Sequence, residues 1–254
     1  MKSKTVAAAY PHVVSTPVLL VRFRSEPERA AVLLDVDGTL APIVERPEDA
    51  AVPEETRAEV ERLAGRYGLV ACISGRPSAD VRRLVDLDSL EYVGVHGLEA
   101  DPEAKRFTPQ LEAFAERIPW PWMVENKGGV TLSFHYREAP ENEGRRQADE
   151  VAAAAEAAGL TAHHGRMVLE VRPPVTVDKG TAVRRLLDGR PIDRALYAGD
   201  DTTDLDAFRG LEEAGLDVAL KIGVGSAEMN PAMLTRADIL VDGPGELLRF
   251  LRTL

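Results

Sequence analysis

Residues 31–40 read AVLLDVDGTL, and this stretch decides the fold. An apolar run leads directly into two aspartates, Asp35 and Asp37, and Gly38 follows them. A continuous apolar run predicts a parallel strand, here residues 31–36, that is buried on both faces. Both carboxylates would then project beyond the carboxyl edge of the sheet, where open α/β sheets bind their ligands. The alternative is an acidic turn in which Gly38 only supplies the bend.

The segments on either side of this strand alternate between helical and strand patterns. Apolar residues recur with helical spacing over residues 53–67, and a second apolar run follows at residues 69–73. This alternation predicts the α/β class, a Rossmann-like parallel-sheet core with right-handed crossovers. The other elements expected in this core are helices at 79–85, 179–188, 203–210 and 245–253 and strands at 92–95, 195–198, 218–222 and 239–241.

Residues 101–173 interrupt the alternation. They contain two pairs of strand patterns with flanking helical patterns, which predicts an inserted α+β unit. Lys127-Gly128-Gly129 supplies the hairpin turn of the first pair. Trp120 and Trp122 are expected to pack in this unit rather than to bind sugar. The elements expected are helices at 109–118 and 143–158 and strands at 123–126, 130–136, 160–164 and 167–171.

The sequence therefore predicts three parts. Residues 1–29 form an N-terminal tail, interrupted by prolines, that we expect to be a loose segment or an edge strand. Residues 30–100 and 174–254 form a core domain, and residues 101–173 form an inserted α+β cap domain. No function is assigned to the tail.

The composition limits the class of protein. Of the 254 residues, 44% are hydrophobic and 29% are charged, which is ordinary globular usage. The net charge of −11 disfavours binding to nucleic acid. Cys72 is the only cysteine, which excludes an intrachain disulfide and suits a reducing cytoplasm. No apolar run approaches the ~18 residues of a membrane span, so we expect a cytoplasmic protein, without nucleic-acid or membrane partners, and favour a monomer.

A second acidic cluster, GDDTTD at residues 199–204, follows another expected strand. It would bring Asp200, Asp201 and Asp204 to the same sheet edge as Asp35. Aspartate and threonine also favour helix N-caps, so we expect one of these residues to cap the next helix. Close carboxylates in a half-buried site repel each other unless a cation compensates them, and oxygen ligands favour a hard divalent metal.

Two further junctions carry the opposite polarity. Ser74-Gly75-Arg76 follows the strand at 69–73 and places a hydroxyl and backbone N–H groups at a helix N-terminus, where anions bind. Lys179 opens the helix before the second acidic strand. Taken singly, Ser74 is a plain helix cap and Lys179 a solvated lysine. Together with the acidic strand ends they supply what phosphoryl transfer needs: a nucleophilic carboxylate, a cation, and donors for the phosphoryl oxygens.

The order of the motifs DVDGTL, SGR, DKG and GDDTTD resembles the haloacid-dehalogenase superfamily of magnesium-dependent phosphotransferases, and the position of the insertion is similar to that of its type II capped members. The resemblance implies that Asp35 is the nucleophile and that Asp37 acts first as general acid and then as general base. It implies that Mg²⁺ lies on the Asp35 carboxylate, the Asp37 backbone carbonyl and Asp200. Asp201 and Asp204 would support these ligands or their waters. The phosphate-binding residues that it implies are Ser74, Gly75 and Lys179.

Four segments resemble the trehalose-6-phosphate phosphatases: VHGLE at 95–99, VENK at 124–127, SFHYR at 133–137 and EVRP at 170–173. The resemblance implies hydrolysis of trehalose 6-phosphate to trehalose and phosphate through an aspartyl-phosphate, in trehalose biosynthesis. Charged and amide side chains on cap strands can pair with the hydroxyls of a sugar. The substrate-binding residues that it implies are His96, Gly97, Glu99, Glu125, Lys127, His135, Arg137, Arg166 and Glu170.

The cap residues also have a structural interpretation. Glu125 and Lys127 flank a hairpin, where they can form a cross-strand surface pair. His135 and Arg137 alternate with aromatic residues, as on the wet face of a half-buried sheet.

Two positions depart from the family pattern. Leu205 stands after GDDTTD where an acidic residue is expected, which puts one supporting contact of the site in question. Arg166 stands where a lysine is expected. It keeps the positive charge but carries it on a planar guanidinium rather than on a compact ammonium, so the contact with the sugar can differ.

Three other functions remain open. Another capped sugar-phosphate phosphatase, acting on sucrose phosphate or mannosyl-phosphoglycerate, would differ only in the cap. A phospho-accepting receiver also uses an acidic pair, a hydroxyl residue and a lysine, but it lacks a cap and a second catalytic aspartate, so Asp37 and the chain length count against it. A non-catalytic sugar-phosphate sensor would bind without turnover, and the intact Asp35 and Asp37 pair counts against that.

Overall fold

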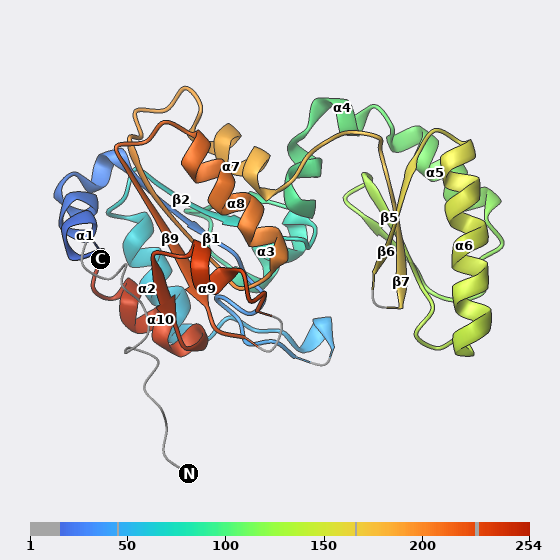
Figure 1. The fold of residues 1–254 in the computed structure, drawn as a ribbon, viewed down its shortest axis with the longest axis horizontal. Helices are drawn as coiled ribbons and strands as arrows, with labels where there is room; N and C mark the ends of the chain where they lie inside the picture. Colours follow the sequence, from blue (N-terminus) through green and yellow to red (C-terminus); the bar gives the residue numbers. More distant parts are fainter. Residues whose placement is uncertain (1–15, 45, 166, 227–228) are drawn as a thin grey trace, which may run out of the picture. The chain divides into compact units, whose positions relative to one another are not determined.

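The computed structural model describes residues 16–44, 46–165, 167–226 and 229–254. They divide into two compact units (Figure 1). Unit 1 holds the described residues up to Ile73 together with those of Arg82–Tyr92 and Lys179–Leu254, and unit 2 holds those of Ser74–Val81 and Val93–Asp178. The domain boundaries expected at residues 100 and 174 stay a prediction.

A parallel sheet forms the centre of unit 1. Its strands are β1 (Ala30–Leu34), β2 (Leu69–Ile73), β3 (Glu91–Val93), β8 (Arg194–Gly199), β9 (Val218–Val224) and β10 (Ile239–Val241). They lie in the order β10-β9-β8-β1-β2-β3, and β1 pairs in parallel with both β2 and β8. All five residues of β1 are buried, as the continuous apolar run requires. The predicted α/β fold with a Rossmann-like parallel sheet is confirmed.

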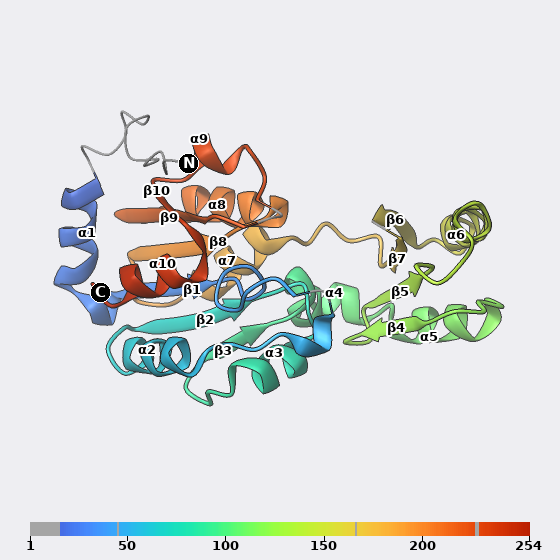
Figure 2. The same ribbon diagram turned by 90° about the horizontal axis from the view of Figure 1, so that it is seen from below.

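Helices cover both faces of this sheet (Figures 1 and 2). The helices are α2 (Glu54–Ala64), α3 (Ser78–Val85), α7 (Lys179–Leu187), α8 (Thr202–Glu213), α9 (Met233–Arg236) and α10 (Gly243–Leu251). α7 packs against α8, and α2 packs against α10. α9 was not expected, because four residues are too short to show helical periodicity. Within the described part of the chain, no helix combines the length and apolar character that crossing a bilayer requires.

A second, antiparallel sheet forms the centre of unit 2. Its strands are β4 (Val124–Lys127), β5 (Thr131–His135), β6 (Thr161–Gly165) and β7 (Val168–Arg172), in the order β4-β5-β7-β6. α5 (Thr108–Arg117) and α6 (Glu141–Ala157) lie on one face of it (Figure 1). The apolar residues between them and the sheet include Phe114, Phe134 and Leu169. The predicted α+β unit and its hairpin turn after Lys127 are confirmed.

The tryptophans of unit 2 pack as expected. Trp120 makes edge-to-face contacts with Trp122 and Phe134, and its Nε1 donates to the carbonyl of His135 at 3.1 Å. Both tryptophans pack, partly buried, against the apolar core of the unit. An indole needs such a partner for its N–H when it packs in a core.

The chain between β3 and α5 differs from expectation. The strand expected at 92–95 ends at Val93, because Val95 and His96 adopt φ of 49° and 55°. These two residues belong to a 3₁₀ segment, η5 (Val95–Ala100), which a short helix, α4 (Pro102–Lys105), follows. A β-branched residue with positive φ is strained, and such strain persists only where the surroundings enforce it.

The tail was predicted incorrectly where the structure describes it. Residues 16–25 form a helix, α1 (Thr16–Ser25), and not a loose segment or an edge strand. Pro17 lies in the first turn, where proline costs no hydrogen bond. Phe23 is fully buried and stacks on Tyr67 with ring centroids 5.4 Å apart, which holds the helix on unit 1. Residues 1–15 lie outside the described residues.

This packing predicts the stability of two variants. Phe23→Ala should lower the free energy of unfolding by about 3–5 kcal/mol, because it leaves a cavity beside Tyr67. Val21→Ala on the same helix is the control, since Val21 is 67% exposed, and it should change stability by less than about 0.5 kcal/mol. Urea unfolding measures both; equal stability of the two variants would contradict the packing of α1.

Candidate active site

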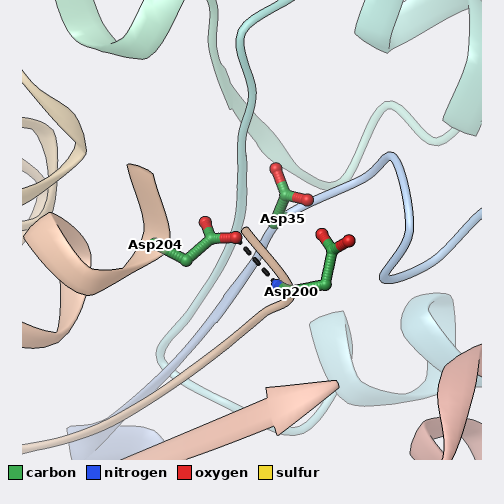
Figure 3. A group of neighbouring side chains, drawn as sticks. All are labelled: Asp35, Asp200 and Asp204. Carbon is green, nitrogen blue, oxygen red and sulfur yellow. Dashed lines mark hydrogen bonds between the residues drawn. The ribbon is translucent and has the colours of Figure 1, made fainter. Parts of the chain in front are cut away.

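Two strand ends of the parallel sheet bring the acidic motifs together. Asp35 follows β1 and Asp200 follows β8, and these strands are neighbours. The backbone N–H of Asp35 donates to the carbonyl of Ala198 at 2.9 Å, so the strand pairing fixes the position of Asp35. Ligand oxygens of Asp35, Asp200 and Asp204 all lie within 4.8 Å of one another, and all three residues are buried (Figure 3). The sequence predicted this convergence from the strand ends alone.

Asp204 is an anchor of the site. Its Oδ1 accepts from Nζ of Lys179 and from the hydroxyl of Tyr197, both at 2.6 Å. Its Oδ2 accepts from the backbone N–H groups of Asp200 and Asp201 at 2.8 and 2.9 Å. A carboxylate accepts about four hydrogen bonds, so Asp204 is saturated and its role is to hold its neighbours.

Lys179 lies at the centre of the site. It opens α7, is 2% exposed, and its Nζ also donates to Oδ1 of Asp35 at 2.7 Å. Burial alone would lower the pKa of Lys179, but Asp204 and Asp35 raise it well above its ordinary value. The ammonium therefore stays charged, and the expectation of an ordinary solvated lysine is excluded.

The charges of the site favour a divalent cation. Burial raises the pKa of Asp35 well above its ordinary value, and that of Asp200 to about 6. One ammonium faces three buried carboxylates, which leaves a net charge of −2 when all are ionised. Oxygen donors and this charge fit a hard divalent metal. Asp35 and Asp200 are the residues whose carboxylate oxygens can coordinate a metal, because the Asp204 carboxylate already accepts four hydrogen bonds.

The motif after β1 shapes the space beside these oxygens. Gly38 has φ of 80°, and a Cβ there would collide with the Asp200 carboxylate, so only glycine fits. The Thr39 hydroxyl lies 3.3 Å from Asp35 Oδ2 and 3.4 Å from Asp200 Oδ1. Asp37 is partly exposed and bridges to Ala41 in the tight turn that follows.

Two of the residues at this site were not singled out in the sequence analysis. Tyr197 lies inside the apolar run of β8 and carries no signal of its polar contact. The Ser226 hydroxyl, which donates to Asp200 Oδ2 at 2.6 Å, follows β9, so the same strand-end argument could have found it. Asp201 caps α8 in a capping box with Asp204, which confirms the expectation that one residue of the cluster is a cap. Leu205 lies half-buried in the first turn of α8.

The segment after β2 belongs to unit 2. Ser74 is buried, and its Oγ accepts from the N–H of Arg76 at 3.1 Å, as a turn residue does. Gly75 lies under the ring of His96, since a Cβ at Gly75 would be 2.8 Å from Cε1 and Nε2 of that ring. The positive φ values of Val95 and His96 thus hold an imidazole against the predicted phosphate-binding turn.

Gly97 and Glu99 complete this loop. Gly97 is buried with φ of 101°. Oε2 of Glu99 accepts from the N–H of Ser78 at 2.9 Å, at the start of α3, and Glu99 also lies against Gly128 of the β4–β5 hairpin. Glu99 therefore ties the loop to a helix start and to the cap hairpin.

Four of the predicted sugar-binding side chains meet on the cap sheet. Nζ of Lys127 lies 3.1 Å from Glu170 and 3.9 Å from Glu125. Nε2 of His135 lies 3.3 Å from Glu125. Arg137 is exposed in the turn after β5 and does not join them. Arg166 lies outside the described residues.

Comparison with known proteins identifies relatives of this chain. A sequence model of the family described as Trehalose-phosphatase matches residues 33–120 and 100–233. The maize (Zea mays) protein named trehalose 6-phosphate phosphatase RA3 is 33% identical over 261 residues, which cover 89% of this chain and 70% of that one.

Solved structures share the fold. The C-terminal domain of the Candida albicans trehalose-6-phosphate phosphatase aligns with a TM-score of 0.66 and 25% identity, covering 97% of this chain and 98% of that one. A haloacid dehalogenase-like hydrolase from Bacteroides thetaiotaomicron aligns with a TM-score of 0.58 and 14% identity, covering 88% and 98%. The chain belongs to the trehalose-phosphatase family, on a haloacid-dehalogenase fold.

Proposed function

We propose that this protein is an enzyme of trehalose biosynthesis that hydrolyses trehalose 6-phosphate to trehalose and phosphate. The observation that carries the proposal is the buried ammonium of Lys179 between Asp35 and Asp204, beside the Asp200 carboxylate. A nucleophilic carboxylate, a fixed positive charge and a place for a divalent cation are what phosphoryl transfer needs. Membership of the trehalose-phosphatase family supports the choice of sugar.

Mg²⁺ is the cation that we propose for this site. Asp35 and Asp200 would hold it with their carboxylates, and Asp37 with its backbone carbonyl. When bound, it neutralises charge on the phosphoryl oxygens and on the two aspartates. Asp201 and Asp204 fix the backbone around Asp200 through the cap of α8.

The roles proposed for the two aspartates are those that the resemblance to the haloacid-dehalogenase superfamily implies. Asp35 attacks phosphorus and forms an aspartyl-phosphate, while Asp37 gives its proton to the leaving sugar oxygen. Asp37 then takes a proton from water as that water attacks the aspartyl-phosphate, which releases phosphate and restores Asp35. Lys179 orients the Asp35 carboxylate, and together with Ser74 and Gly75 it holds phosphoryl oxygens.

The cap side chains suit a neutral polyol. Lys127 pairs with Glu125 and Glu170, and Arg172 also pairs with Glu170. The two carboxylates and the two cations sum to zero, so no net charge has to be neutralised by the ligand. The N–H donors and carboxylate oxygens that remain can bind hydroxyls. His96, Gly97, Glu99, His135, Arg137 and Arg166 complete the sugar site that we propose.

The roles of the two aspartates predict different losses. Asp35→Asn should abolish turnover, because an amide is a poor nucleophile. Asp37→Asn should lower kcat by about 10²–10⁴-fold through loss of acid–base catalysis. Asp88→Asn, at a fully exposed carboxylate, is the control with unchanged turnover.

Beryllofluoride, a phosphate mimic, should form an adduct on wild type and on Asp37→Asn but not on Asp35→Asn. An adduct on Ser74 would show that the nucleophile has been assigned incorrectly.

A panel of sugar phosphates at fixed Mg²⁺ tests the substrate. Trehalose 6-phosphate should have the highest kcat/KM, above sucrose phosphate, mannosyl-phosphoglycerate and glucose 6-phosphate. Lys127→Ala should lower kcat/KM for trehalose 6-phosphate by about one to two decades, since a hydrogen bond to a charged group is lost. The kcat/KM for p-nitrophenyl phosphate should stay nearly unchanged. A higher rate on another sugar phosphate would favour a different capped phosphatase, and binding without turnover would favour a sensor.

A further inference from the structure

One face of the cap sheet carries a line of alternating charges. Across the four strands Glu125 lies opposite Ser133, Ser133 opposite Glu170, and Glu170 opposite His163, so these side chains share one face. Phe134 and Leu169, one residue along on β5 and β7, face the apolar core. The polar face therefore carries an unbroken series of side chains, which we call the charge row: His135, Glu125, Lys127, Glu170 and Arg172.

Glu170 is held from both sides in this row. Its Oε1 accepts from Nζ of Lys127 at 3.1 Å and lies 3.5 Å from the Ser133 hydroxyl. Its Oε2 accepts from Nη2 of Arg172. Of about four acceptor positions on a carboxylate, three are used, and the fourth, on Oε2, is left for a ligand.

The two cations also keep Glu170 ionised. Burial would raise the pKa of Glu170, but Arg172 and then Lys127 outweigh it and lower the pKa to about 2. The other groups that face Glu170 are Glu125 on β4 and His163 on β6. Below neutral pH the carboxylate thus remains a full acceptor.

We propose that Arg172 is a positioning residue of the sugar site, which fixes the Glu170 carboxylate so that its free acceptor position meets a sugar hydroxyl. The proposal rests on the proposed hydrolysis of trehalose 6-phosphate. Arg172 follows Glu170 by two residues on β7, so the two side chains rise from the same face of one strand. A planar guanidinium restricts the orientation of a carboxylate more than a flexible ammonium does. Lys127 alone therefore could not fix the orientation of the Glu170 carboxylate.

Arg172→Met tests this inference, because it keeps the apolar stem and removes the guanidinium. The measured quantity is the ratio of kcat/KM for trehalose 6-phosphate to kcat/KM for p-nitrophenyl phosphate, which cancels changes in the chemical step. We expect this ratio to fall about tenfold in Arg172→Met and less in Arg172→Lys, which keeps a positive charge. Arg146→Met is the matched control, since Arg146 pairs with Glu150 in the same unit but on the solvent-exposed side of α6, and its ratio should stay at the wild-type value.

Two further readouts separate positioning from general support of the fold. Lowering the pH from about 6 to about 4 should reduce the ratio further in Arg172→Met than in wild type, because loss of Arg172 lets the pKa of Glu170 rise from about 2 toward its ordinary value of 4.5. In a Glu170→Gln background, Arg172→Met should lower the ratio by less than about twofold, since the group that it positions is already changed.

The outcomes are distinct. Equal losses on both substrates, a ratio that stays at the wild-type value, or losses that multiply in the double variant would overturn the role of Arg172 and leave the proposed function standing. A wild type that hydrolyses trehalose 6-phosphate no faster than glucose 6-phosphate would instead overturn the proposed function, and this inference with it.

Discussion

The ammonium of Lys179, buried between Asp35 and Asp204, is the interaction on which the core of this protein depends. Three carboxylates cannot be brought this close in a buried site without a compensating charge. The strand order makes the arrangement possible, because β1 and β8 are neighbours and end side by side, while α7 begins with the lysine between them. The fully buried β1 and the saturated Asp204 then serve one purpose, to hold Asp35 and Asp200 at fixed positions.

The sugar site that we propose on the cap sheet meets a different electrostatic requirement. A phosphate needs net positive compensation, whereas a disaccharide is neutral and needs many oriented donors and acceptors. The charges of the charge row neutralise one another. Lys127 lies at the centre of the row, where it pairs with both Glu125 and Glu170. Mutual pairing reduces the conformational entropy that ligand binding has to remove. The apolar face behind the row, where Phe134 packs on Phe114, keeps the strands rigid.

The fold and the acidic site could be predicted because each rests on local pattern. The buried strands can be recognised in the sequence as apolar runs. Asp35 and Asp200 come directly after two of these runs, so their place at the sheet edge could be predicted. Other features depend on contacts between distant residues. The docking of α1 requires Tyr67 opposite Phe23, and the buried hydroxyl of Tyr197 is indistinguishable in the sequence from another apolar position of β8. Val95 has a positive φ, although a β-branched residue prefers a negative one. Only the contacts of the surrounding loop can enforce this conformation.

The central claim is that the net charge of −2 on Lys179 and the three buried carboxylates creates a binding site for a divalent cation. Binding of Mg²⁺ in the absence of substrate tests this claim most directly. Isothermal titration calorimetry of the metal-free protein should show one Mg²⁺ per chain, and Asp200→Asn should abolish that binding while the protein stays folded. An Asp200→Asn protein that binds Mg²⁺ as wild type does, or a wild type that binds no divalent cation, would contradict the account.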